Sequence, residues 1–208
     1  MKLTVLGASG RTGRSIVEVA VSRGHDVIPV VRDPAKARPE WHDKAAIAEG
    51  TDVAALAAAT HGVDAVASTV GHIPGQDIHV MEKCAIATVA AMRAAGVSRL
   101  VVITASGPYT DGDGPFTRYL AKPLIQRMLR NQFADMVATE RVIRESGIDW
   151  TFVRPPRLTN GTARNRYRAR RDGNVRRGIQ LTRGDLARAV VDLVEDPTAV
   201  GQAVSVAR

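Results

Sequence analysis

The sequence feature that most constrains the fold is a run of glycines close to the start of the chain. A short apolar segment, residues 3–6, leads into Gly7, Gly10 and Gly13, and a helical pattern of apolar residues begins at Arg14. When a strand turns into a helix through small residues, the first helical N–H groups stay unpaired at the positive end of the helix dipole and attract phosphate. The spacing G-x-x-G-x-x-G differs from the common G-x-G-x-x-G fingerprint, so an ordinary strand–helix turn is the alternative. The position between a strand and a helix favours a phosphate-binding turn.

The residue that ends the second predicted strand indicates which dinucleotide would bind. Residues 25–31 have the pattern of a strand, and Arg32 follows, 19 residues after Gly13. Units that bind NAD carry an acidic residue at about this distance, which accepts hydrogen bonds from the ribose. A guanidinium instead suits a 2′-phosphate, which it can hold by two hydrogen bonds, and Arg11 and Arg38 could join it. A solvated strand-end charge is the alternative reading of Arg32, but we predict NADP(H) as the cofactor.

Length and composition are those of an ordinary globular protein. The chain has 208 residues, of which 45% are hydrophobic and 24% charged, and we expect one domain over residues 1–208. No apolar run approaches the roughly 18 residues that indicate a membrane span. The single cysteine, Cys84, cannot form an internal disulfide, and the five histidines show no metal-ligand spacing. We expect a cytoplasmic monomer or weak homodimer with no metal and no membrane partner.

The net charge of +8 is concentrated in one stretch. Residues 164–177 contain seven arginines and one aspartate, a local sum of +6, so the rest of the chain carries only +2. Asp172, Gly173 and Asn174 are typical of a turn, and we predict that residues 164–177 form a hairpin-like excursion with an arginine-rich face, within a basic substrate-side excursion over about 155–182. Its charges could protect a solvated sheet edge, recognise an anionic small molecule, or bind nucleic acid. The sequence has no clustered aromatic residues for base stacking, so nucleic acid is the least favoured partner.

Strand and helix patterns alternate along nearly the whole chain. This order predicts an α/β fold, a Rossmann-type, doubly wound parallel sheet with a small C-terminal extension over the substrate side. The helical region 116–146 should break into two helices at Pro123. The strands are expected at 3–6, 25–31, 45–47, 63–71, 100–104, 148–153 and 203–206, and the other helices at 14–21, 52–60, 78–95 and 182–195.

Ligands of such sheets bind outside the carboxyl ends of the strands, which defines the candidate site. Ser106 follows the fifth strand, where the nicotinamide and the substrate should meet; capping of the next turn is its alternative role. Glu49 follows the third strand and could border the adenine, although a surface role is equally compatible. The residues expected at the cofactor are Gly7, Ser9, Gly10, Arg11, Thr12, Gly13, Arg32, Glu49, Val70, Gly71, Thr104 and Pro155.

Several segments together resemble a known family. Residues 7–13, 63–66, 145–151 with 154–156, and 182–187 match, in this order, the atypical short-chain dehydrogenases. The similar branch contains NmrA-like proteins and the flavin reductase also called biliverdin reductase B. This resemblance implies a Rossmann fold, NADP(H) and, in the reductase members, hydride transfer to a flavin or linear tetrapyrrole. It also implies that Gly10 to Gly13 hold the pyrophosphate, Arg32 the 2′-phosphate, and that Ser106 is the catalytic serine.

Two departures from the family keep two functions open. Tyr119 and Lys122 are three residues apart, whereas a Tyr-x-x-x-Lys proton-donor pair needs four. Arg157 stands where biliverdin reductase B has a histidine, and arginine stays charged at any working pH. With Ser106 and Tyr109, Arg157 could bind an anionic small-molecule substrate. The first hypothesis is an NADPH-dependent reductase of a flavin, quinone or similar conjugated acceptor. The alternative is a non-catalytic NADP(H) sensor.

Overall fold

The computed structural model describes residues 1–41, 43–73, 75, 77–115 and 117–208, and its centre is one eight-stranded sheet. The strand order is β3-β2-β1-β4-β5-β6-β10-β8, and all neighbours are parallel except β10 and β8. Strands β2 and β3 extend the sheet on one side of β1, and β4, β5, β6, β10 and β8 extend it on the other side. This confirms the predicted doubly wound Rossmann-type α/β fold. The strands are Lys2–Leu6 (β1), Asp26–Val31 (β2), Ala46–Ile47 (β3), Ala65–Ser68 (β4), Arg99–Ile103 (β5), Asp149–Arg154 (β6), Arg168–Arg171 (β8) and Gln202–Ala207 (β10).

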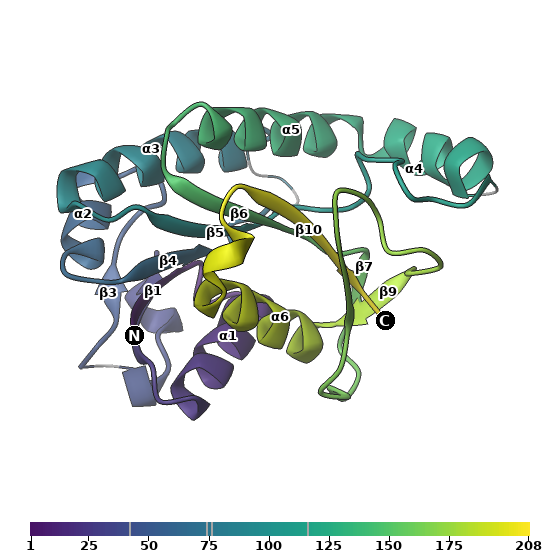
Figure 1. The fold of residues 1–208 in the computed structure, drawn as a ribbon. Coiled ribbons are helices and arrows are strands. Elements are labelled where there is room, and N and C mark those ends of the chain that lie inside the picture. Colours follow the sequence, from purple (N-terminus) through teal and green to yellow (C-terminus); the bar gives the residue numbers. More distant parts are fainter. Residues whose placement is uncertain (42, 74, 76, 116) are drawn as a thin grey trace.

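Helices cover both faces of the sheet (Figure 1). One layer holds α1 and α6, which pack on each other, and the other holds α2, α3 and α5. Each layer closes its own hydrophobic core, one centred on Leu3, Ile16 and Leu186, the other on Leu56, Met92 and Phe152. The helices are Arg11–Ser22 (α1), Val53–Thr60 (α2), Val80–Ala95 (α3), Lys122–Met128 (α4), Arg130–Arg144 (α5) and Arg183–Glu195 (α6), with short turns at Pro34–Lys36 (η1), Pro39–Trp41 (η2), Thr117–Ala121 (η3) and Pro197–Ala199 (η4).

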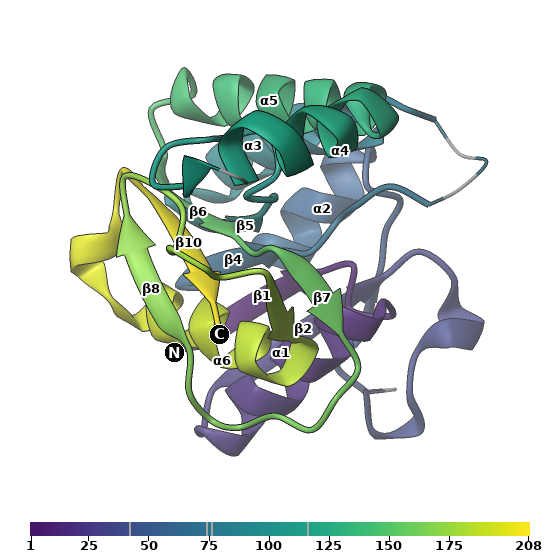
Figure 2. The ribbon, with the colours of Figure 1, turned by 90° about the vertical axis from the view of Figure 1, so that its right-hand side faces the viewer.

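The predicted break at Pro123 is only partly right, because the π-helical η3 gives way to α4 at Lys122, beside this proline, but the chain stays helical there. Pro123 is the second residue of α4, where the first turn tolerates a proline because its N–H would lack a helical partner anyway. The interruption falls instead at Leu129, between α4 and α5. The helix α4 continues the layer of α5 outward, beyond the end of the sheet (Figures 1 and 2).

The predicted basic hairpin is also wrong in its pairing. The turn at Asp172 and Gly173 exists, with positive φ at both residues, but the chain beyond it does not pair with β8. Asn174 is held instead by the loop after β5, because its side-chain amide donates to the Tyr109 carbonyl at 2.7 Å. The arginine-rich strand β8 therefore pairs with β10 and forms the exposed edge of the sheet.

A small second sheet lies beyond the carboxyl ends of the central strands (Figures 1 and 2). It pairs Arg157–Thr159 (β7) with Gln180–Thr182 (β9) in parallel. These two strands are the part of the 155–182 excursion that faces the ligand end of the sheet. Within the described residues, no helix has both the length and the apolar character needed to cross a bilayer.

Candidate dinucleotide and substrate site

A cleft of about 460 Å³ lies at the carboxyl ends of β1 and β4, where the strand order reverses. This volume is within the usual range for small-molecule sites. Ten of the twelve residues expected at the cofactor line it: Gly7, Ser9, Gly10, Arg11, Thr12, Gly13, Arg32, Glu49, Val70 and Gly71. The other two, Thr104 and Pro155, are buried outside the cleft. Their roles at the cofactor remain predictions.

The glycines of the first turn are needed for different reasons. Gly7 has a φ of +75°, a conformation that side chains other than glycine rarely adopt. A Cβ at Gly13 would lie 2.3 Å from the Gly7 carbonyl oxygen, so only glycine lets α1 pack against the turn. A Cβ at Gly10 would meet only that oxygen, at 3.2 Å. Gly10 is therefore a glycine at which a side chain would disturb the fold less than at Gly13.

The N-terminus of α1 has the properties of an anion site. Gly10 is the N-cap and makes no side-chain cap hydrogen bond, and the first turn contains no acidic residue. The first N–H groups of the helix are therefore free to donate to a ligand at the positive end of the dipole. The pyrophosphate of a dinucleotide fits this donor set, and the glycine turn leaves space for its close approach.

Three arginines line the cleft. The guanidinium groups of Arg11 and Arg32 have no carboxylate partner within the described part of the chain. Arg183, at the first turn of α6, was not expected here; it donates to the Asn160 side-chain oxygen at 2.5 Å. Burial and the nearby charge of Arg11 lower the pKa of Arg183. Two cations close enough to affect each other favour a bound anion.

Arg38 does not join this group. Its guanidinium donates to Glu18 at 2.8 Å and to Glu40 at 3.2 Å, and it does not line the cleft. The charge expected to help with the 2′-phosphate is therefore used to hold the η2 turn to α1.

The single cysteine lies at the floor of the cleft. A Cβ at Gly50 would approach the Cys84 Sγ to 2.6 Å, so the chain after β3 passes directly over the thiol. Burial, Asp135 and Glu49 raise the pKa of Cys84, with Arg32 acting in the opposite direction. The thiol is therefore protonated at neutral pH, as expected for an inert cysteine.

The loop that carries Ser106 is held mainly through backbone groups. The Ser106 N–H donates to the Pro155 carbonyl at 2.9 Å, and the Lys122 ammonium donates to the Ser106 carbonyl at 3.0 Å. Lys122 also donates to the Tyr109 carbonyl and pairs with Asp113 at 2.5 Å. The Ser106 hydroxyl makes no hydrogen bond to any described residue, and Ser106 does not line the cleft, so its contact with a ligand remains a prediction.

Tyr109 and Thr104 belong to a buried network around Glu140. The Glu140 carboxylate, only 3% exposed, accepts from the Thr104 hydroxyl at 2.9 Å, from the Tyr109 hydroxyl at 2.8 Å and from the Arg154 Nε at 3.0 Å. Arg154 also lies over the Tyr109 ring, 3.4 Å from its centroid. Burial followed by the Glu140 charge raises the pKa of Tyr109 far above its ordinary value. Tyr109 therefore contributes to the rigidity of this loop and is a poor proton donor.

A histidine–carboxylate pair at the cleft was missed from the sequence. His72 lines the cleft, and its Nε2 lies 2.7 Å from an Asp135 oxygen and 3.1 Å from the Ile78 carbonyl. Both partners accept, so Nε2 carries a hydrogen. The two residues are 63 positions apart, and no local motif joins them.

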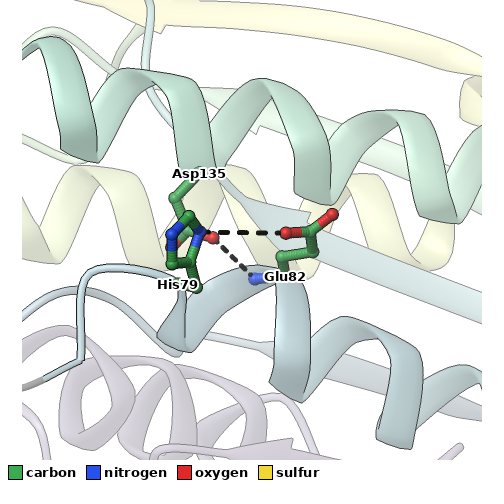
Figure 3. Close-up of side chains that lie close together, drawn as sticks. All are labelled: His79, Glu82 and Asp135. Atoms are coloured by element: carbon green, nitrogen blue, oxygen red, sulfur yellow. Dashed lines mark hydrogen bonds and ion pairs between the residues drawn. The ribbon is translucent and has the colours of Figure 1, made fainter.

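Asp135 also belongs to a group that resembles a cation site (Figure 3). Ligand atoms of His79, Glu82 and Asp135 lie within 4.8 Å of one another. Both Asp135 oxygens, however, accept backbone N–H groups at the start of α3, from Met81 at 2.9 Å and Glu82 at 3.0 Å. The Asp135 carboxylate, which α5 carries, therefore caps the N-terminus of α3.

The predicted anion-binding arginines have separate environments. Arg157 starts β7, is exposed and pairs with no acidic side chain among the described residues. In contrast, Arg171 on β8 pairs with Asp196 at 3.0 Å, and Arg168 donates to the Arg176 and Arg208 carbonyls. On the basic strand, Arg171 is therefore the arginine with an acidic partner among the described residues, and the role of Arg157 toward a substrate remains a prediction.

A family model described as NAD(P)H-binding matches residues 7–197. The chain therefore belongs to the NAD(P)H-binding family, the class that its fold and cleft define. The chain is similar to YwnB of Bacillus subtilis, with 26% identity over 203 residues that cover 95% of this chain and 93% of that protein.

Solved structures with low sequence identity share the fold. A short-chain dehydrogenase/reductase of Veillonella parvula, determined in complex with NADP, has a TM-score of 0.84 and 16% identity and covers 100% of this chain and 94% of that one. ChuY, an anaerobillin reductase of Escherichia coli O157:H7, has a TM-score of 0.81 and 19% identity and covers 100% and 97% of the two chains. These likenesses confirm the Rossmann fold that the resemblance to short-chain dehydrogenases implies.

Proposed function

We propose that this protein is a reductase that takes hydride from NADPH and passes it to a flavin, quinone or similar conjugated acceptor. The observation that carries the proposal is the cleft at the uncapped N-terminus of α1, with Arg11 and Arg32 at its wall and no carboxylate of a described residue paired to either. The neighbours described as an NADP complex and as a reductase support this reading.

In this proposal, the chain's own residues bind and orient both reactants. The N–H groups after Gly10 hold the pyrophosphate, and Arg32 with Arg11 holds the 2′-phosphate. The chemistry supplied when NADPH is bound is hydride donation. Val70 and Gly71, after β4, border the cleft with little bulk, and the free Ser106 hydroxyl donates to or accepts from the acceptor. Because its surrounding loop is rigidly held, Ser106 can position the acceptor without reorganisation.

A specific observation favours a non-catalytic NADP(H) sensor as the second candidate. The groups that could deliver a proton near Ser106 are already used, because the Tyr109 hydroxyl donates to Glu140 and Lys122 pairs with Asp113. A reduced flavin takes its proton from water, so a reductase tolerates this arrangement. A sensor, however, needs no proton donor at all.

One pair of measurements separates the two candidates. Fluorescence titration with NADPH measures binding, and steady-state oxidation of NADPH against FMN, riboflavin and small quinones measures turnover. We expect micromolar or tighter binding together with turnover of at least one acceptor. Tight binding without turnover of any acceptor would favour the sensor, and absence of NADPH binding would refute both.

A further inference from the structure

The segment between the loop after β5 and α5 exposes a cluster of large apolar side chains. Within residues 117–129, six such side chains are exposed: Tyr119 by 73%, Leu120 by 63%, Leu124 by 65%, Ile125 by 44%, Met128 by 74% and Leu129 by 37%. Single exposed apolar residues are normal, but a contiguous group of this kind marks an interaction surface. We call residues 117–129 the apolar arm.

The charges on and beside the apolar arm have one sign. Arg118, Arg127 and Arg130 are exposed, and none pairs with a carboxylate of a described residue. The sequence from 114 to 134 contains no aspartate or glutamate. The flanking acids are buried, since the Asp113 side chain is 8% exposed and paired with Lys122, and Asp135 is 1% exposed. The surface is therefore apolar and cationic.

The inner side of the apolar arm is firmly attached to the domain. Lys122 is buried against the 106–109 loop, and the Gln126 side chain donates to the Gly107 carbonyl at 3.1 Å. Figures 1 and 2 show α4 at the outer end of the α5 layer, beyond the sheet. The apolar side chains of the arm are thus exposed although the arm itself is held firmly against the domain.

We propose that the apolar arm is a docking surface for an anionic lipid bilayer. Leucine, isoleucine and methionine side chains can enter the acyl boundary, while unpaired arginines contact anionic headgroups, as in helices that lie in a membrane interface. Tyr119 has the amphipathic ring that is enriched at this depth.

This docking is distinct from a membrane span. The expectation of no membrane partner was based on the lack of long apolar runs, and a seven-residue helix such as α4 cannot span a bilayer. It can lie on one. Through Lys122 and Gln126, a docked arm would hold the 106–109 loop next to the lipid surface, whatever reaction the protein performs.

Vesicle flotation tests the proposal. The probes are vesicles of phosphatidylcholine alone and vesicles in which phosphatidylglycerol makes up a third of the lipid, at low and moderate salt. We expect at least about tenfold stronger partitioning onto the anionic vesicles, reduced by salt, because several arginines face the headgroups. The double variant Leu124→Ser with Met128→Ser should reduce this partitioning by at least about tenfold. The matched control is Ile179→Ser, which alters an equally exposed side chain outside the arm, 73% exposed.

Each outcome has a defined meaning. Flotation that is absent, equal on both vesicles, or unchanged in the double variant would overturn the proposal. Self-association in sedimentation that only the double variant abolishes would assign the arm to an interface between copies of this chain instead. NADPH titration of the same samples verifies folding, and its result depends on the cleft alone, so failure of the reductase proposal is distinguishable from failure of this one.

Discussion

At the scale of single residues, Glu140 has the largest set of partners around the loop after β5. It accepts hydrogen bonds from Thr104, Tyr109 and Arg154 and lies 3.3 Å from Arg144. Burial by itself would raise the pKa of Glu140. The hydrogen bond and charge of Arg154, together with hydrogen bonds from Tyr109 and Thr104, hold this pKa below its ordinary value. This one carboxylate links β5, β6 and α5 beneath the predicted substrate site.

We predict that Glu140→Gln lowers the free energy of unfolding by about 3 kcal/mol, because it leaves the Arg154 cation buried without a counter-charge. The folded-state pKa is depressed, so this contribution is complete above the unfolded value of about 4.3 and is lost as pH falls through the folded pKa. Urea denaturation at neutral and acid pH measures both effects. The exposed Glu145→Gln is the control, and similar losses in the two variants would refute the argument.

Gly10 and Gly13 should respond differently to added side chains. Gly10→Val should abolish NADPH binding while leaving the melting temperature nearly unchanged, since its Cβ meets only the Gly7 oxygen at 3.2 Å. Gly13→Ala should destabilise the fold by about 1–3 kcal/mol, because its Cβ would overlap the turn. Calorimetry measures the stability of the two variants, and NADPH titration measures their affinity for the dinucleotide. Unchanged NADPH affinity in Gly10→Val would remove the pyrophosphate from this turn.

Arg32→Glu should lower the preference for NADPH over NADH by at least about tenfold. Loss of one charge-assisted contact costs roughly 1.5–3 kcal/mol, and the new carboxylate repels the 2′-phosphate. The ratio of the two dissociation constants is the measurement. Arg38→Glu is the matched control, because Arg38 pairs with Glu18 and Glu40 outside the cleft. If only the control changed the ratio, the 2′-phosphate site would lie at Arg38.

At the scale of elements, α3 depends on α5 for its first turn. Its own N-cap residue, His79, makes no side-chain cap hydrogen bond, and Asp135 from α5 accepts the N–H groups instead. The same carboxylate holds His72 at the edge of the cleft. Packing of two helices and the shape of the dinucleotide cleft are therefore coupled through one side chain.

Asp135→Ala should lower the free energy of unfolding by about 2 kcal/mol, which is the upper range for loss of an N-cap, and should also weaken NADPH binding by releasing His72. The control is Asp77→Ala, which removes an exposed carboxylate that pairs with Lys83 and accepts the His79 N–H at 2.9 Å, and so measures an exposed contact at the same helix start. Denaturant melts and NADPH titration provide the comparison. Loss of stability with unchanged affinity would show that His72 does not shape the cleft.

At the scale of the whole molecule, the charge of +8 should favour anionic acceptors. Steering by arginines predicts a lower KM for FMN than for riboflavin, with an advantage that shrinks as salt is added. Arg157→Ala should raise the KM for FMN about tenfold and leave that for riboflavin nearly unchanged. Arg171→Ala, a change at an arginine paired with Asp196, is the control. Equal KM values for the two flavins would return Arg157 to a surface role.

The architecture and the cofactor turn were predictable because they depend on short-range patterns. The alternation of strands and helices follows from apolar periodicity, and the glycine turn follows from backbone geometry at Gly7 and Gly13. The predicted break at Pro123 was only partly right because a proline is acceptable in a first helical turn, so the same residue is compatible with a start or a stop. The predicted hairpin was wrong because the residues Asp172–Asn174 favour a turn but do not determine which strand pairs with β8.

By itself, the sequence determined the alternation of strands and helices, the glycine turn after β1 and the cationic residue at the end of β2, since each is encoded within about thirty neighbouring residues. Only the tertiary structure decided the long-range pairings: Asp135 with His72 and α3, Glu140 with Arg154, and Arg183 beside Arg11. These contacts join residues that no periodicity connects. Their geometry arises when the sheet and its helices pack, because packing alone decides which distant polar groups are buried together and must satisfy one another.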